Sequence, residues 1–414
     1  MCIFSCKDHL KNIITIANFL VKKAKLCYNI KTENQRRVPV KVFSITWYEK
    51  LRKLDYIVLF SAVALTFVSL ITLAGAAHDY GARIFYVQLV ATVLGVFMMT
   101  IISTIDYEEI TERFSPFIFG FCVFLLVLTL VVGEDNGSGN RNWINIPGFP
   151  VSIQPSEFVK VMYIITFSKH LHTLRDKINH PKSLIRLGIH AGVIIGLVLL
   201  QGDLGSALVF MFITAAMLLC SGLSLWYFLG AGVAVVAAAP LLWKILKPYQ
   251  QARILAGFWP ETDPQDKGFQ ALMSRNAITA GGFWGTGFSG GTEYQKVPFA
   301  HTDFIFAITG EKFGFFGALI VIVLLCTLVV RAMVLAYKMN GSYASYMCVG
   351  VAAVIIAQSL ENIGMCLAKL PVVGITLPFM SYGGSSMLAS FCLIGVVQSI
   401  NAHRDKYFFE RQKS

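Results

Sequence analysis

The chain has 414 residues and a net charge of +12, with 56% hydrophobic and only 14% charged residues. A soluble domain carries about 25% charged residues, so this chain has too few to cover a water-facing surface. The mean hydropathy of +0.64 agrees with this. These values exclude a soluble enzyme, a disordered chain and a secreted disulfide scaffold, and they predict an all-α integral membrane protein.

Lys and Arg are frequent near the N-terminus, for example at Lys22, Lys23, Arg36 and Arg37. Basic residues beside apolar spans are typical of cytoplasmic segments that face anionic lipid. We therefore interpret residues 1–54 as a basic cytoplasmic tail and expect no nucleic-acid partner. The basic residues 404–414 are predicted to form a second cytoplasmic tail.

A membrane-spanning helix needs about 20 mainly apolar residues. Ten stretches fit: 56–77, 84–105, 116–133, 156–172, 184–201, 205–222, 225–246, 304–331, 343–367 and 378–402. The sequence therefore predicts a domain of about ten transmembrane helices over residues 55–403. An even number of spans places both tails on the same side, as their shared basic character also indicates.

One connection, residues 247–302 between the seventh and eighth spans, is far longer than an ordinary connector. Its aromatic residues favour a folded segment on the extracytoplasmic side that covers a substrate. The glycines from 281 to 287 permit a close approach of the backbone to a ligand. Glu311 and Lys312, in the eighth span, fit either a further polar pair or an interfacial one.

A first polar cluster combines Arg141 with residues 154–160. Pro155 and Glu157 suit the first turn of a helix, and Glu157 precedes Lys160 by three residues, so the two share a helix face. One interpretation is an internal ion pair that closes helix packing. The other is a charged lining for an anionic substrate, because ionisable groups in a bilayer are often functional.

Two further clusters lie at predicted turns. Gln201 and Asp203 come just before the sixth span, where Asp203 is predicted to cap the helix. Ser381, Gly383 and Ser385 belong to a stretch rich in small residues at the start of the last span. These residues allow a tight helix crossing; alternatively, free N–H groups at this helix start bind phosphate.

A fourth cluster lies in and after the long connection. Asp263 followed by Pro264 is a common turn pair. Alternatively, an Asp263 carboxylate with a raised pKa in this aromatic, glycine-rich segment acts as a general base. His301 and Asp303 stand just before the eighth span.

The predicted topology puts all four clusters at the outer end of the spans, above an apolar interior. Packing motifs without a further role are expected at both ends. The one-sided placement therefore indicates a site for an amphiphilic substrate whose polar head lies outside.

Together these clusters resemble the SEDS family, the integral-membrane peptidoglycan polymerases of shape, elongation, division and sporulation. The resemblance covers about residues 50–405. Three stretches carry it: Gln-Pro-Ser-Glu-Phe-Val-Lys at 154–160, His-Thr-Asp-Phe-Ile-Phe-Ala at 301–307 and Leu-Pro-Phe-Met-Ser-Tyr-Gly-Gly-Ser-Ser at 377–386.

The resemblance implies a ten-helix fold in the bacterial cytoplasmic membrane and a glycosyltransferase that polymerises lipid II. It also implies a class B penicillin-binding protein as transpeptidase partner. The family's catalytic Asp falls on Asp263, and its charged pair falls on Glu157 and Lys160. No tightly bound cofactor is implied, although a divalent cation, Mg²⁺ or Mn²⁺, is compatible with the chemistry.

This chain departs from the family pattern at Gly202, Thr286, Phe299 and Lys312, where the family usually has Pro, Lys, an acidic residue and Glu. These departures keep one alternative open, a non-catalytic scaffold for the penicillin-binding protein. A second alternative is a lipid II flippase, a transport role that the resemblance to the family also allows. One-sided polar clusters disfavour the flippase. The stretch from Leu51 to Tyr56 resembles the elongation (rod-shape) branch more than the division or sporulation branch.

Overall fold

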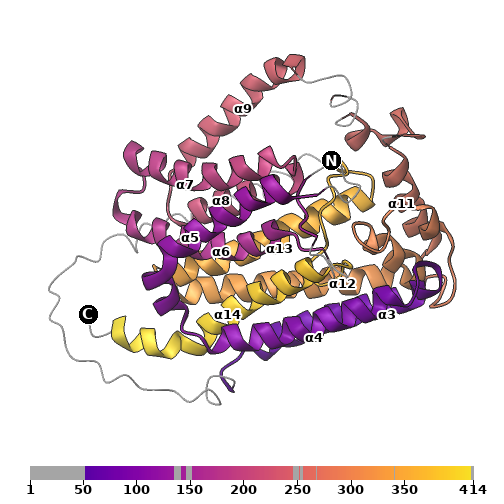
Figure 1. Ribbon diagram of the computed structural model, residues 1–414, viewed down its shortest axis with the longest axis horizontal. Coiled ribbons are helices and arrows are strands. Elements are labelled where there is room, and N and C mark those ends of the chain that lie inside the picture. The colour runs from indigo at the N-terminus through magenta and orange to yellow at the C-terminus, as the bar shows by residue number, and fades with distance from the viewer. Residues whose placement is uncertain are drawn as a thin grey trace, which may run out of the picture. The chain divides into compact units, whose positions relative to one another are not determined.

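The computed structural model describes residues 52–134, 141–145, 152–245, 251, 255–266, 268–339 and 341–411 (Figure 1). Contacts divide the chain into a unit from Ile45 to Arg404 and a second unit made of the two chain ends. Residues 1–51 and 412–414 of the predicted tails lie outside the described residues.

The described residues are mostly helical, with two isolated β-bridges, Glu134 with Trp143 and Ile144 with Ile153. The long helices are α3 (Tyr56–Tyr80), α4 (Arg83–Thr104), α5 (Tyr107–Val132), α6 (Pro155–Thr173), α7 (Pro181–Leu200), α8 (Leu204–Cys220), α9 (Leu225–Ile245), α12 (Ile305–Lys338), α13 (Tyr343–Cys366) and α14 (Gly384–Arg411). Short elements are η2 (Arg175–Lys177), η3 (Pro260–Thr262), α11 (Phe269–Ala280) and η4 (Glu293–Lys296).

Each of the ten predicted spans overlaps one long helix, which confirms the all-α membrane class. Among the described residues, seven helices are long and apolar enough to cross a bilayer, and α8 and α9 contain shorter apolar helices. The apolar sequence of α6 is interrupted by the charged residues Glu157, Lys160 and Lys169. The total of ten spans therefore stays a prediction, while the chain is a multi-pass membrane protein.

Helices α13 and α14 are the most buried of the candidate spans. Helix α12 packs against α13 and α3, and α13 also contacts α6 and α8. Glycine permits the closest crossings between α4 and α14: a Cβ on Gly95 would meet Phe391, and one on Gly395 would meet Ile102. Small residues at helix crossings are the usual means of tight packing in membranes.

The described part of the predicted 247–302 connection contains η3, α11 and η4. Helix α11 packs on α12, and Ser274 Oγ donates to Cys366 O at the end of α13 (2.9 Å). Two glycines of this segment allow contact with α12: a Cβ on Gly281 would come within 2.0 Å of Gly310 O, and one on Gly285 within 2.1 Å of Lys312 O. They approach α12, which differs from the predicted approach to a ligand.

Polar groups also pair at the opposite end of the helices. Arg331 Nε in α12 donates to Asp55 Oδ2 before α3 (2.9 Å). The Nδ1 atoms of His170, near the end of α6, and His190, in the middle of α7, lie 3.0 Å apart. The expectation that polar clusters occur at one end only is therefore wrong, because a single sequence does not reveal which isolated polar residues meet across helices.

Candidate active site

The ion pair predicted at the start of α6 is present and buried. Lys160 Nζ donates to Glu157 Oε1 over 2.7 Å, and the two residues are 2% and 6% exposed. Pro155 occupies the first turn of α6, as predicted. The two side chains form no further hydrogen bond within the described part of the chain. The pair therefore keeps unused hydrogen-bonding capacity, which suits a group that binds a ligand.

Asp203 caps α8 as predicted, and it also joins two other segments. Its carboxylate accepts from Ser206 N (2.9 Å), Ser206 Oγ (2.8 Å), Asn142 Nδ2 (2.9 Å) and Gln154 Nε2 (3.3 Å). These neutral dipoles stabilise a charge that is only 5% exposed. Asp203 thus connects the start of α8 to the start of α6 and to the segment after α5.

The first turn of α14 joins this network through Ser385, whose Oγ accepts from Gln154 N (3.1 Å). Ser381 Oγ accepts from Leu377 N (2.7 Å) within the loop before α14. Gly383 N donates to Gln88 Oε1 of α4 (3.3 Å). The Gly383 N–H is therefore engaged by the protein, which removes it as the free phosphate donor that the sequence allowed. Ser385 is the one of the three that contacts the start of α6.

Arg141 and Gln201 meet through the backbone, with Arg141 N donating to Gln201 O (3.2 Å). Gln201 Nε2 also donates to Leu126 O near the end of α5 (2.9 Å). The Arg141 side chain is exposed. The structure thus holds the backbone beside Arg141 in place and leaves its guanidinium accessible to an anion.

Asp303 and His301 lie just before α12 and are half-buried. Burial, together with the nearby Asp203 carboxylate, raises the pKa of Asp303 to about 6. The His301 ring lies between Tyr80 (4.8 Å) and Tyr382 (5.4 Å). Burial lowers the pKa of His301, which favours the neutral form of its ring.

Asp263 follows η3 in a tight loop. Its N–H donates to Pro260 O (3.2 Å), and its C=O accepts from Gly268 N (2.8 Å). A Cβ on Gly268 would come within 2.1 Å of Pro260 O, so this closure requires glycine there. The spacing between Asp263 and Gly268 therefore defines a closed loop that presents a half-buried carboxylate.

Buried polar atoms without a hydrogen-bond partner among the described residues include Asn142 Oδ1, Ser156 Oγ and Gln201 Oε1 in the segments of this network, and also His301 Nδ1 before α12 and Gln358 Nε2 in α13. Buried polar atoms are nearly always hydrogen-bonded, so such a concentration points to water or a ligand. Gln88 and Gln358, both inside helices, were missed by sequence reasoning. A polar amide within an apolar span is the signal that could have found them.

No group of three or more His, Cys, Asp or Glu that could hold a metal ion occurs in the part of the chain that the structure describes. Asp203 is the buried carboxylate of this network, and its Oδ2 already accepts three hydrogen bonds. This carboxylate is a poor metal ligand in its present arrangement. The divalent cation stays a prediction.

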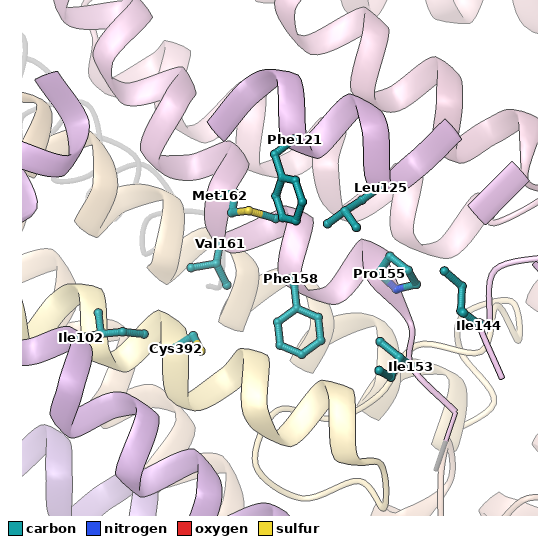
Figure 2. A pocket seen from close by; sticks show the side chains of 10 residues that line it. All are labelled: Ile102, Phe121, Leu125, Ile144, Ile153, Pro155, Phe158, Val161, Met162 and Cys392. Carbon is teal, nitrogen blue, oxygen red and sulfur yellow. The ribbon is translucent and has the colours of Figure 1, made fainter. Parts of the chain in front are cut away.

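An apolar cavity of about 500 Å³ lies beside α6 (Figure 2). Its lining residues are Ile102, Phe121, Leu125, Ile144, Ile153, Pro155, Phe158, Val161, Met162 and Cys392. At 100° per residue along α6, Phe158 and Met162 lie on one side and the Glu157–Lys160 pair lies on another. One helix thus borders both an apolar cavity and a polar network, which suits an amphiphilic ligand.

A family model described as cell cycle protein, which covers FtsW, RodA and SpoVE, matches residues 51–406. A probable peptidoglycan glycosyltransferase FtsW of Trichlorobacter lovleyi is 32% identical over 85% of this chain and 94% of its own. Peptidoglycan glycosyltransferase MrdB of Escherichia coli K12 is 31% identical over 87% of this chain and 96% of its own. These identities are too close to decide between branches of the family.

Two solved structures are similar in fold. One is a chain from work on the structural coordination of polymerization and crosslinking by a peptidoglycan synthase complex, with a TM-score of 0.75, 29% identity and coverage of 86% of this chain and 98% of that one. The other is the rod shape determining protein RodA of Thermus thermophilus, with a TM-score of 0.65, 25% identity and coverage of 85% and 97%.

Proposed function

This chain belongs to the family of cell cycle proteins that contains FtsW, RodA and SpoVE, and from that premise we propose that it is a peptidoglycan glycosyltransferase. It polymerises lipid II into glycan strands at the outer face of the cytoplasmic membrane. The observation that carries the proposal is the convergence of separate polar segments at one end of the helices, beside an apolar cavity.

Asp263 is proposed as the general base. Its carboxylate takes the proton from the GlcNAc 4-hydroxyl of one lipid-linked disaccharide. That oxygen forms a bond to the anomeric carbon of MurNAc on the growing chain, the bond from this carbon to the pyrophosphate oxygen breaks, and the linkage is inverted to β. Undecaprenyl pyrophosphate leaves with the bonding electron pair, and Asp263 returns its proton to water.

The departing pyrophosphate needs a positive charge close by. Two cations of this chain suit that role: Lys160, which Glu157 holds at 2.7 Å, and the exposed Arg141. Neutral donors such as Gln201 and Ser385 border the same region and suit the sugar hydroxyls. The apolar cavity beside Phe158 suits the undecaprenyl chain.

A class B penicillin-binding protein is proposed as the partner that crosslinks the strands. The similarity to a chain of a peptidoglycan synthase complex supports this assignment. Both termini are proposed to lie in the cytoplasm, because both predicted tails are basic. This orientation puts Asp263 on the side where glycan strands are made.

A lipid II flippase is the second candidate. The argument against it from one-sided polar clusters no longer holds, because polar pairs such as Asp55 with Arg331 occur at the other end of the helices. A flippase moves lipid II across the bilayer without joining disaccharides. The scaffold alternative requires neither reaction.

The test is lipid II polymerisation by the purified protein with and without its class B penicillin-binding protein. The variants are Asp263→Asn, Asp263→Ala and, as a matched control, Asp266→Ala, which removes an exposed acid from the same loop. We expect glycan chains from wild type and Asp266→Ala and none from either Asp263 variant. Transfer of labelled lipid II across vesicles without glycan chains would instead establish the flippase, and neither activity would establish the scaffold.

A further inference from the structure

The turn that follows α11 is fixed to α12 by four backbone hydrogen bonds. The donor and acceptor pairs are Phe315 N to Gly282 O (2.9 Å), Phe316 N to Phe283 O (3.5 Å), Thr286 N to Glu311 O (2.9 Å) and Gly287 N to Lys312 O (3.0 Å). These α12 groups are available because Gly314, at φ 65°, interrupts the helix. A Cβ on Gly314 would come within 2.4 Å of Gly285 N, so only glycine allows this contact. The turn is therefore rigidly held.

Two large aromatic side chains project from this rigid turn. Phe283 is 69% exposed and Trp284 is 82% exposed. The Phe283 ring lies 6.0 Å from Phe315, and the Trp284 ring lies 4.9 Å from Phe316. Phe315 and Phe316 begin an exposed apolar face of α12 that continues through Leu319, Ile320, Val323 and Val330.

We infer that Phe283 and Trp284 form an aromatic anchor, which inserts into the headgroup and acyl boundary of the same bilayer that α12 crosses. Three observations identify lipid as the occupant. The anchor is continuous with the lipid-facing side of a membrane helix. Aromatic side chains, Trp above all, favour this boundary because they combine an apolar body with a polar edge. The backbone hydrogen bonds also hold the turn, and with it both aromatic residues, beside Phe315 and Phe316 on this face of α12.

The anchor determines the position of Asp263 through α11. This helix begins at Phe269, directly after the loop closed by Asp263 and Gly268, and it ends at Ala280, directly before the anchored turn. Twelve residues of α-helix are about 18 Å long. Since α11 is also fixed to α13 through Ser274 Oγ, it links the two sites as a strut. This consequence rests on the proposed function, because it gives Asp263 a fixed height above the membrane for the sugar hydroxyl.

The insertion is tested by tryptophan fluorescence of the full chain in phosphatidylcholine vesicles. Lipids brominated near the headgroup quench nearby indole rings, and iodide quenches rings in water. The difference between wild type and Trp284→Phe isolates the signal of Trp284, and Trp259→Phe is the matched control for a second exposed tryptophan of the same connection. We expect the Trp284 signal to be quenched by the brominated lipid and protected from iodide. Iodide quenching without lipid quenching would overturn the anchor.

The consequence for Asp263 is tested by polymerisation in vesicles with Phe283→Ser/Trp284→Ser and with the apolar pair Phe283→Leu/Trp284→Phe. We expect about a tenfold loss or more for the serine pair, at unchanged Tm, and near wild-type activity for the apolar pair. Equal activity of all three proteins would contradict the claim that the anchor positions Asp263 through α11. Absence of glycan chains from wild type would refute the proposed function together with this consequence, and the fluorescence result would still decide the anchor.

Discussion

Two helices carry a buried Glu and Lys in the part nearest their N-terminus: α6 at Glu157 and Lys160, and α12 at Glu311 and Lys312. In α6 the residues are three apart, lie on one face and bind each other. In α12 they are adjacent, point in different directions and cannot pair in the same way. The spacing thus distinguishes the two pairs. Residues three apart form an ion pair that is available to a ligand, whereas adjacent residues bind separate groups of the protein and stabilise the fold.

The α12 charges hold the connection that contains the proposed base. Glu311 accepts from the N–H groups of Glu293 and Tyr294, and Lys312 donates to the C=O groups of Phe288 and Gly290, at 2.6 to 3.1 Å. The Lys312 ammonium also lies 4.8 Å from the centre of the Tyr294 ring. All of these partners belong to the connection itself, so we assign Glu311 and Lys312 a structural role. Lys312 is also one of the departures from the family pattern, and here it has a full set of partners.

The largest effect on stability is therefore expected from Glu311→Ala. This variant leaves one buried and one part-buried N–H group without an acceptor and the neighbouring Lys312 charge uncompensated, which costs about 3 kcal/mol or more. Thermal unfolding in detergent measures the loss. Glu293→Gln, which breaks only the exposed pair with Lys296, is the control and is expected to cost less than about 1 kcal/mol. A Tm for Glu311→Ala equal to that of this control would contradict the structural role.

Gly285→Ala tests the same contact, between the connection and α12, through the backbone. The added Cβ would meet Lys312 O at 2.1 Å, and φ at this residue is +82°, so we expect a loss of about 1–3 kcal/mol. Gly192→Ala in α7 is the control, because nothing lies within 4 Å of its Cβ. Unfolding curves of the two variants that coincide would show that the turn does not depend on this approach.

The variant Asp303→Asn tests the polar end of the molecule through the pH dependence of its thermal stability. The folded pKa of Asp303, about 6, lies above its ordinary value of 3.8. The group therefore favours the folded state most at low pH, and this contribution is lost as pH rises from about 4 through 6. We expect Asp303→Asn to unfold at a higher temperature than wild type at pH 7.5, with the difference shrinking toward pH 5. A difference in Tm that does not change with pH would contradict the raised pKa.

The smallest effect is expected from Ser206→Ala. It removes one of the four hydrogen bonds to the Asp203 carboxylate and keeps the capping N–H. Loss of one such bond costs about 1 kcal/mol, to be measured by thermal unfolding beside Asp203→Asn. A cost as large as that of Glu311→Ala would mean that the site end of the molecule is also primarily structural.

Features set by neighbours in the sequence were predictable. The helices overlap the ten apolar stretches, Glu157 pairs with Lys160, and Asp203 caps α8, because each depends on spacing along one segment. Contacts between distant segments were not predictable. Gln88 in α4 binds the loop before α14, and the glycines after α11 pack on α12. The sequence around Gln88 or around these glycines does not identify the segment that each contacts.

The assignment of residues to the site has the same limit. Sequence spacing identified Asp263 as a turn residue with a carboxylate, and the structure adds that Gly268 closes the loop around it. Gln358 has no neighbouring motif, so only its unpartnered Nε2 in the folded protein identifies it. The role of each residue toward a substrate depends on groups that no single segment contains.

The most direct test of the comparison is the double variant Glu157→Gln/Lys160→Met, with Tm and lipid II polymerisation measured on the same preparation. Replacing both members of a buried pair leaves no unpaired charge, so folding is expected to tolerate it. The account predicts a Tm close to that of wild type and a loss of polymerisation of about 100-fold or more. Wild-type polymerisation at an unchanged Tm would contradict it, because the α6 pair would then have no role toward the substrate.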